Sequence, residues 1–347
     1  MGVLQLEMSL PSSSSSSFSI LLPVRDYDLA ATLDSGQVFR WQPERGRPAR
    51  VNQNPQLAGE PPALRSSWAG VVGKQFIRLT QTSDGIRAET AEPVENWHWL
   101  HDFLQTETDL ASVLKTFPDD EPMRAAVAAC RGLRVLRQEP WECLASFILS
   151  STKQIVQIRQ IVSLLCERFG EPLAYCAATW ERRRLAGPQC HNKPVHSPAE
   201  RQRSQNDNRL FFSFPTAASL AAATEAELRA CKMGFRAPHL LAAARQMTDG
   251  KLDLDTIRSL PLEEARAELM KLRGVGGKIA DCVLLFAYGF DSAFPVDVWI
   301  ERALRQLYFP RRRVSEKKLL HFAATHFGPH AGYAQQYLFH YMRTKMK

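Results

Sequence analysis

Three glycines and a valine stand directly before a lysine in the segment LRGVGGKIADC, residues 272–282. The helical pattern EEARAELMKL ends at this segment and the pattern KIADCVLLFAY begins at the lysine, which predicts two helices joined by a tight hairpin. Gly274, Val275, Gly276 and Gly277 would form its turn. Glycine permits positive φ and leaves N–H groups open at a helix N-terminus, where the helix dipole favours an anion. A DNA phosphate fits there without base reading. A plain turn between two helices is the alternative.

Lys278 opens the second helix, where the dipole disfavours a cation and a purely structural helix would carry Asp or Glu. A neutral amine at this place is a nucleophile that can form a Schiff base. Asp297, in AFPVDVWIERAL, follows 19 residues later and precedes a helical pattern, so its ordinary role is a helix N-cap. Together the two residues offer an amine and a carboxylate. A fixed carboxylate stabilises positive charge that develops on a sugar.

The composition favours a polyanionic partner without establishing one. The chain has 347 residues, a hydrophobic fraction of 45%, a formal net charge of +8 and a pI of about 9.2. This length allows one large domain or two domains with a sizeable core. Its seven cysteines are spread singly with no C-x-x-C pair, which favours unpaired thiols in a reducing compartment. No cysteine follows Cys282, which excludes a four-cysteine iron–sulfur loop at the C-terminus.

The sequence contains no clear targeting signal and no recognisable metal-binding motif. The N-terminus lacks the charged and apolar regions of a signal peptide, and no apolar run reaches membrane-spanning length. The segment CHNKPVH, residues 190–196, matches no common zinc spacing, so we expect no metal site. We expect an intracellular monomer that does not bind membranes. It would lie in the cytoplasm or nucleoid of a bacterium, or in the nucleus of a eukaryote.

The pattern of residues predicts an α+β fold in two parts. Residues 1–19 would be a disordered, serine-rich tail. Residues 20–130 would form an N-terminal antiparallel β domain, with strands at QVFRW (37–41), WAGVVG (68–73) and QFIRLTQT (75–82), although helical periodicity already begins near Trp97. Residues 131–347 would form an all-α helix–hairpin–helix body with a basic inserted loop at about 182–209.

Six segments in this order carry a family resemblance. The chain resembles the helix–hairpin–helix DNA glycosylases, and more closely an 8-oxoguanine DNA glycosylase/lyase, from about Leu21 to His340. The segments are LDSGQVFRW (33–41), LRQEPWECLASFILSSTKQI (136–155), KMGFRA (232–237), LRGVGGKIADC (272–282), PVDVW (295–299) and GYAQQYLF (332–339). The resemblance implies base-excision repair of double-stranded DNA that contains oxidised guanine, without a metal or an organic cofactor.

The resemblance also implies catalytic roles. Lys278 would attack the sugar C1′ and then hold the Schiff base that permits strand cleavage by β-elimination. Asp297 would stabilise the sugar cation.

The flipped base would be held by four residues, again as the resemblance implies. Gly36 would supply a carbonyl to the N7–H of 8-oxoguanine, Cys282 and Phe339 would sandwich the base, and Gln335 would read its Watson–Crick edge. Gln335 and Phe339 share one helix face at i and i+4, which suits a flipped base. Without the family, a core Phe339, a solvated Gln335, a core Cys282 and a turn or bulge glycine at position 36 are the ordinary interpretations.

The resemblance further places two residues inside the duplex. Phe235 would wedge into the gap left by the flipped base, and Arg236 would read the orphaned partner base. The plain alternative for Phe235 is a helix-end hydrophobic contact. The chain departs from the best-known eukaryotic members at Thr152, Gln157 and Trp299, where those members have Asn, Arg and His. The first two departures put a strict preference for cytosine opposite the lesion in doubt.

Two rival functions remain at this point. One is an alkylbase glycosylase of the same fold, which would act with the aspartate alone and would lack the hairpin lysine. The other is a non-catalytic DNA-binding protein that uses the hairpin only to contact phosphate. The second rival requires Lys278 and Asp297 to be dispensable.

Overall fold

The computed structural model of the chain describes residues 17–44, 67–173 and 211–345. The predicted inserted loop at 182–209, the CHNKPVH segment and the part of the serine-rich tail up to residue 16 lie outside the described residues. The predicted end of the tail at residue 19 is wrong, because Ser17, Phe18 and Ser19 belong to a strand.

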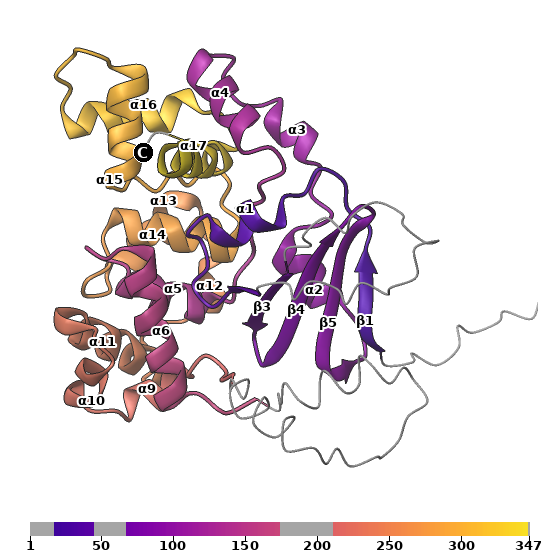
Figure 1. Ribbon diagram of the computed structural model, residues 1–347. Coiled ribbons are helices and arrows are strands. Elements are labelled where there is room, and N and C mark those ends of the chain that lie inside the picture. Colours follow the sequence, from indigo (N-terminus) through magenta and orange to yellow (C-terminus); the bar gives the residue numbers. More distant parts are fainter. Residues whose placement is uncertain (1–16, 45–66, 174–210, 346–347) are drawn as a thin grey trace, which may run out of the picture.

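A five-stranded antiparallel sheet forms one side of the molecule (Figure 1). Its spatial order is β1-β5-β4-β3-β2, and its strands are β1 (Ser17–Leu22), β2 (Gln42–Glu44), β3 (Ser67–Val72), β4 (Gln75–Thr82) and β5 (Gly85–Val94). The helices α1 (Leu29–Asp34) and α2 (His98–Leu104) share a core with the sheet. Leu33 of α1, Ile77 and Leu79 of β4 and Leu100 of α2 are fully buried in this core.

The QVFRW segment is irregular, and its prediction as a strand is wrong. Gly36 has a φ of +86°, and the buried side chain of Gln37 replaces the neighbouring strand as a hydrogen-bond partner. The Gln37 amide nitrogen donates to Thr32 O (3.1 Å) and Arg134 O (2.8 Å), while its Oε1 accepts from Leu136 N (2.8 Å). Alternating residue types therefore reflect burial here and not sheet pairing.

Helices make up the remainder of the described chain, so the predicted α+β class is confirmed. The α-helices are α3 (Leu110–Leu114), α4 (Glu121–Ala129), α5 (Pro140–Leu149), α6 (Ile155–Phe169), α9 (Ala217–Ala221), α10 (Glu225–Ala230), α11 (Ala237–Thr248), α12 (Leu254–Ile257), α13 (Leu262–Met270), α14 (Gly277–Val283), α15 (Val298–Ala303), α16 (Glu316–His326) and α17 (Ala331–Lys345). A 3₁₀ turn, η3 (Gly234–Arg236), precedes α11, and the π-helical turns η4 (Leu284–Tyr288) and η5 (Leu304–Tyr308) extend α14 and α15. None of the described helices is long and apolar enough to cross a bilayer.

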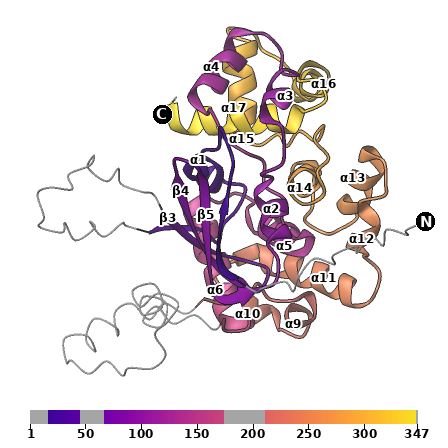
Figure 2. The ribbon, with the colours of Figure 1, turned by 90° about the vertical axis from the view of Figure 1, so that its right-hand side faces the viewer.

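The C-terminal helix connects the two ends of the chain. Helix α17 passes beside α1, as two views at right angles show (Figures 1 and 2). The Gln336 amide donates to Ser35 O (3.2 Å), and the Arg343 guanidinium donates to Asp34 O (3.3 Å). Segments about 300 residues apart therefore meet at the turn that contains Gly36.

We predict that Gln37→Ala lowers the free energy of unfolding by about 2–4 kcal/mol, because buried main-chain groups lose their partners. Urea unfolding would measure this loss. Gln160→Ala, which changes an exposed glutamine on α6, is the matched control and should stay within about 0.5 kcal/mol of the unaltered chain. Equal stabilities of the two variants would contradict this account of the turn.

Candidate active site

The hairpin between α13 and α14 packs against α11 at Gly274 and has open space beside Gly276 and Gly277. A Cβ placed on Gly274, whose φ is +86°, would lie 2.6 Å from Cγ of His239 on α11. The corresponding positions on Gly276 and Gly277 have no atom within 4 Å, whereas Val275 is buried. The N–H groups in the first turn of α14 have no acceptor within the helix, because every α-helix begins this way. The turn therefore has the open backbone that the predicted phosphate contact requires.

A half-buried ion pair fixes the two helices of the hairpin. Arg266 Nε on α13 donates to Asp281 Oδ1 on α14 over 2.7 Å, and the same guanidinium pairs with Glu263. Burial raises the pKa of Asp281, and Arg266 acts against this shift. The angle between the helices, and with it the direction of the first residue of α14, is thus held by a charged contact.

Lys278 directs its amine toward the C-terminal end of α5. Its Nζ donates to Ser150 Oγ (3.1 Å) and lies 5.5 Å from the centre of the Phe147 ring. Ser150 Oγ in turn donates to Phe147 O (2.7 Å), which orients a lone pair toward the amine. Among the described residues, no carboxylate oxygen lies within 4.0 Å of the Lys278 amine. A neutral hydroxyl, which sequence reasoning did not identify, is therefore its close partner.

Asp297 is the N-cap of α15, as its position in the sequence predicts. Its Oδ1 accepts from both Trp299 N (3.0 Å) and Ile300 N (2.9 Å). Burial raises the pKa of the Asp297 carboxyl, while the Ile300 and Trp299 N–H groups and the charges of Lys278 and Arg343 act against the shift. Because both backbone bonds use Oδ1, Oδ2 is left for another partner.

Gly36 and Phe339 approach each other at the turn after α1. A Cβ on Gly36 would lie 2.6 Å from Ile155 Cδ1 and 3.3 Å from Phe339 Cε1. The positive φ favours glycine here, and a Cβ would also have to displace the end of the Ile155 side chain. The structure thus places Gly36 beside the Phe339 ring. The predicted contact of the Gly36 carbonyl with a base stays a prediction.

Gln335 is almost fully buried on α17, one turn before Phe339. Its Oε1 is the only buried side-chain oxygen of the described residues that lacks a hydrogen-bond donor. Leaving such a group unpaired is unfavourable, and sites of this kind call for a functional explanation. This acceptor fits a ligand that carries N–H donors.

Cys282 lies on α14, one helical turn after Lys278. It is buried, and burial raises the pKa of its thiol to about 12. The charges of Lys278 and Asp297 both act on this thiol, so the three side chains are near neighbours. A thiol with this pKa is a small apolar surface at neutral pH and not a nucleophile.

Arg343 is a neighbour of Phe339 and Gly36 that sequence reasoning missed. Its guanidinium carbon lies 5.4 Å from the centre of the Phe339 ring, and its Nη1 lies 3.6 Å from the Cβ position of Gly36. Burial lowers the pKa of Arg343, whereas Asp34 and Asp297 act to raise it. Its spacing of four residues after Phe339 is the signal that could have identified it.

The candidate wedge is only partly as expected. Phe235 in η3 is 55% exposed, which suits insertion into a duplex. Arg236 is buried and not presented outward: its guanidinium donates to Ser151 O, to Met233 O (3.1 Å) and to Thr152 Oγ1. Its predicted reading of a base would require the side chain to leave these acceptors.

The three departing residues have local structural roles. Thr152 is exposed at a φ of +55°, where it accepts the bond from Arg236. Gln157 caps α6 by accepting from Gln154 N (3.2 Å). Trp299 contributes its backbone N–H to Asp297, and its ring lies 5.8 Å from the guanidinium carbon of Arg302.

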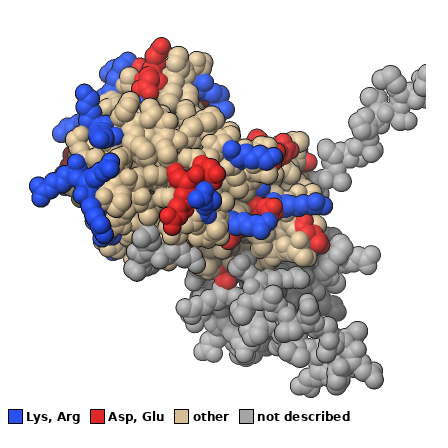
Figure 3. All heavy atoms as spheres, turned by 90° about the horizontal axis from the view of Figure 1, so that it is seen from above, with Lys and Arg blue, Asp and Glu red and all other residues tan. Residues whose placement is uncertain are grey.

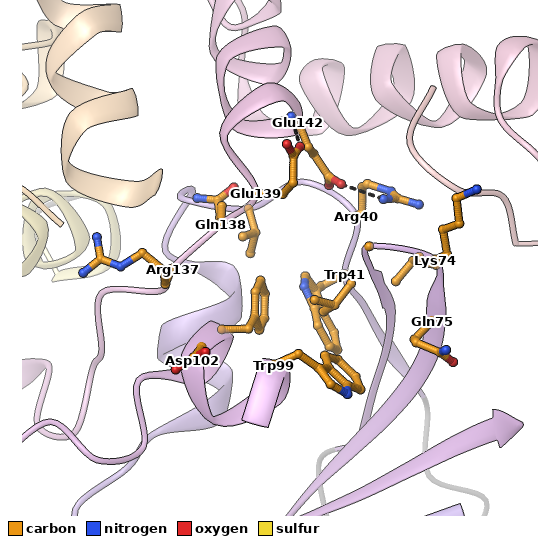
Figure 4. A pocket seen from close by; sticks show the side chains of 15 residues that line it. Arg40, Trp41, Lys74, Gln75, Trp99, Asp102, Arg137, Gln138, Glu139 and Glu142 are labelled. Carbon is orange, nitrogen blue, oxygen red and sulfur yellow. Dashed lines mark hydrogen bonds and ion pairs between the residues drawn. The ribbon is translucent and has the colours of Figure 1, made fainter. Parts of the chain in front are cut away.

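A separate cavity of about 450 Å³ lies at the N-terminal end of α5 (Figure 4). Trp41, Trp99 and the ion pair of Arg40 with Glu142 (2.9 Å) are among its lining residues. None of the predicted site residues lines it. The Lys278 amine meets the opposite end of α5, about 15 Å away for a helix of this length. The described residues also contain no cluster of three or more His, Cys, Asp or Glu side chains that could hold a metal.

Comparison with known proteins gives consistent matches over nearly the whole chain. Residues 19–144 match the model for the 8-oxoguanine DNA glycosylase N-terminal domain, and residues 145–325 match that for the HhH-GPD superfamily base excision DNA repair protein. A "Probable N-glycosylase/DNA lyase" of Methanothermobacter thermautotrophicus is 28% identical, over 93% of this chain and 95% of the relative.

Two solved structures are similar at 26% identity. The structure of MBOgg1 in complex with a low affinity DNA ligand has a TM-score of 0.78 and covers 96% of this chain and 98% of its own. Clostridium acetobutylicum 8-oxoguanine glycosylase/lyase, in complex with double-stranded DNA containing cytosine opposite 8-oxoG, has a TM-score of 0.74 with 95% and 99% covered.

Because the Asp297 side chain caps α15, its replacement by alanine and its replacement by asparagine should affect stability differently. Asp297→Ala removes the cap and should lower the free energy of unfolding by about 1 kcal/mol. Asp297→Asn keeps an acceptor oxygen and should stay within about 0.5 kcal/mol of the unaltered chain. Thermal unfolding of the three proteins checks this difference. An alanine variant as stable as the asparagine variant would show that the cap does not support α15.

Proposed function

The chain belongs to the HhH-GPD superfamily of base excision DNA repair proteins, and we propose that within it the chain is a glycosylase and lyase that removes 8-oxoguanine from double-stranded DNA. The unpaired, buried oxygen of Gln335, on the same helix face as Phe339, carries this proposal. Lys278 and Asp297, whose charges act on each other, supply the amine and the carboxylate. The names of the relatives, and the DNA in the similar structures, support it. We propose further that the protein acts as a monomer.

The proposed reaction begins with extrusion of the damaged nucleotide. Phe235 fills the gap in the duplex, and the base enters between Phe339 and Cys282. Gln335 Oε1 accepts from an N–H group on the base edge. An oxidised purine carries an additional N7–H, which the Gly36 carbonyl accepts in this proposal. The pocket thus recognises the base by its donors.

The chemical steps use the amine and the carboxylate. As the C1′–N9 bond breaks, its electron pair leaves with the base, and Asp297 stabilises the positive charge on the sugar. The Lys278 nitrogen forms the new bond to C1′ and loses a proton. Ring opening gives a Schiff base, whose β-elimination cleaves the strand on the 3′ side of the sugar. The Ser150 hydroxyl, which holds the amine at 3.1 Å, keeps it pointed at this centre.

Borohydride trapping tests the proposal. The protein is mixed with a duplex that contains one 8-oxoguanine, and both base release and the reduced covalent complex are quantified. We predict that the unaltered chain does both, that Lys278→Gln forms no complex, and that Asp297→Asn loses at least about two orders of magnitude in rate, because charge stabilisation on this scale is typical of such groups. Lys271→Gln, at an exposed lysine on the same hairpin, is the matched control and should behave normally.

The other outcomes of this assay separate the rival functions. Base release without any trapped complex would indicate a glycosylase that uses water instead of the lysine. Binding to the duplex without base release would indicate a non-catalytic DNA-binding protein. Either result contradicts the proposed mechanism.

We predict little preference for the base opposite the lesion. Gln157 is engaged as the cap of α6, and Arg236 is held by Ser151 and Thr152, so two of the candidate readers are occupied within the protein. Single-turnover rates opposite C, A, G and T should lie within about tenfold, since a strong base-specific contact would contribute about 1–3 kcal/mol of discrimination. A hundredfold preference for cytosine would show that Arg236 leaves its buried position to read that base.

A further inference from the structure

We propose that exposed basic residues from α15 to the start of α16 bind the phosphates of one duplex arm, several base pairs from the damaged nucleotide. This basic surface consists of Arg302, Arg311, Arg312, Arg313, Lys317 and Lys318. The inference rests on the proposed function, since it takes double-stranded DNA as the substrate. It adds a second contact that the hairpin and the base pocket do not make.

The charge of this surface is not compensated by carboxylates. Within the part of the chain that the structure describes, none of its six residues forms an ion pair. By contrast, two exposed arginines elsewhere have partners: Arg124 pairs with Asp119, and Arg131 pairs with Asp26 (3.0 Å). Glu316 is the only acidic residue between positions 311 and 318. The view from above shows Lys and Arg side chains gathered on the side of the molecule where α15 and α16 lie (Figure 3).

The turn that presents the arginines has an unusual residue at its third position. Arg312 N donates to Phe309 O (3.2 Å), which closes a β-turn with proline at its second position. Arg311 occupies the third position at a φ of +63°. A turn with this pattern normally has Gly or Asn there, since other side chains are strained at positive φ. An arginine at this position is unfavourable for the turn, which favours a role for its charge.

The turn is also held in place. The Arg305 guanidinium pairs with Glu301 (2.8 Å) and donates to Val314 O (2.8 Å), which ties the segment after the turn back to α15. The ring of Phe309 packs against that of Phe322 on α16, with 5.0 Å between centres. Because the backbone of the turn is already fixed, binding to phosphates would have to order only the arginine side chains.

The position of this surface relative to Asp297 defines its place on the duplex. From its N-cap Asp297, α15 continues through η5 to Tyr308, a span of about 16 Å at 1.5 Å per residue. Its exposed face begins with Val298, which is 76% exposed, and continues with Arg302 four residues later. A duplex that follows this face rises 3.4 Å per base pair, so the arginine turn would meet phosphates about five base pairs from the damaged nucleotide.

Arginine and lysine at this distance would supply affinity without reading sequence. Each phosphate that they neutralise releases counterions, so binding becomes more sensitive to salt. The DNA arm on this side should therefore strengthen binding only if it is long enough to reach the surface.

Equilibrium binding to duplexes with arms of different length tests the proposal. Each 25-base-pair duplex carries one tetrahydrofuran abasic analogue, which lacks the base and cannot be processed. The analogue lies either at the centre or three base pairs from one end or the other. The test variant combines Arg311→Ala, Arg312→Ala and Arg313→Ala. The control variant combines Arg87→Ala, Arg124→Ala and Arg131→Ala, which removes the same charge from exposed positions elsewhere.

We expect the test variant to bind the centred duplex about 10- to 100-fold more weakly at low salt. The slope of log affinity against log salt should become shallower by about one for each phosphate that the variant no longer neutralises. Shortening the arm that reaches the basic surface should weaken DNA binding by the unaltered chain to a similar degree. It should not change DNA binding by the test variant. The control variant should stay within about threefold of the unaltered chain. Equal binding by the test variant and the unaltered chain, or equal weakening of the test and control variants, would overturn the proposal.

A separate readout distinguishes this proposal from the proposed function. At saturating protein, the rate of 8-oxoguanine release should be the same for the test variant and the unaltered chain. If neither releases the base, the proposed activity fails, while the arm-length measurement still decides whether this surface binds DNA.

Discussion

The carboxylate of Asp297 is the constraint on which the remainder of the site depends. Oδ1 accepts from two of the free N–H groups at the start of α15, so the charge that would act on a sugar also fixes the position of the helix. Helix α15 packs against α17, which carries Gln335 and Phe339. Helix α17 in turn contacts Ser35 beside Gly36. One partly buried carboxylate thus sets the starting point for residues that come from both ends of the chain.

Hydrogen-bond satisfaction separates the supporting structure from the site. Around Gly36, the buried amide of Gln37 forms hydrogen bonds with several main-chain groups. These bonds stabilise the turn and use both the donor and the acceptor of the amide. Gln335 has the same side chain and a similar burial, but its oxygen has no donor. The two buried glutamines therefore differ in whether the side-chain oxygen accepts a hydrogen bond. The first stabilises the fold, and the second has an open acceptor that suits a ligand with an N–H group.

The hairpin can be predicted from the sequence because its constraints are local. Glycines between two apolar-periodic segments specify the turn, and Asp297 before a helical pattern specifies its cap. The contacts of Lys278 with Ser150 and of Phe339 with Gly36 join distant segments, so residue spacing does not predict them without the family resemblance. Alternation of residue types is misleading at QVFRW, where a side chain and not a strand supplies the hydrogen bonds. The inward direction of Arg236 likewise depends on acceptors more than 80 positions away.

In the proposed mechanism, the Lys278 nitrogen becomes covalently bound to the sugar. Mass spectrometry of the borohydride-reduced complex, after digestion by a protease and a nuclease, tests this most directly because it identifies the modified residue. We predict that the sugar remnant will be attached to the peptide that contains Lys278, next to the hairpin glycines. Attachment to another lysine or to the N-terminal amine would contradict it.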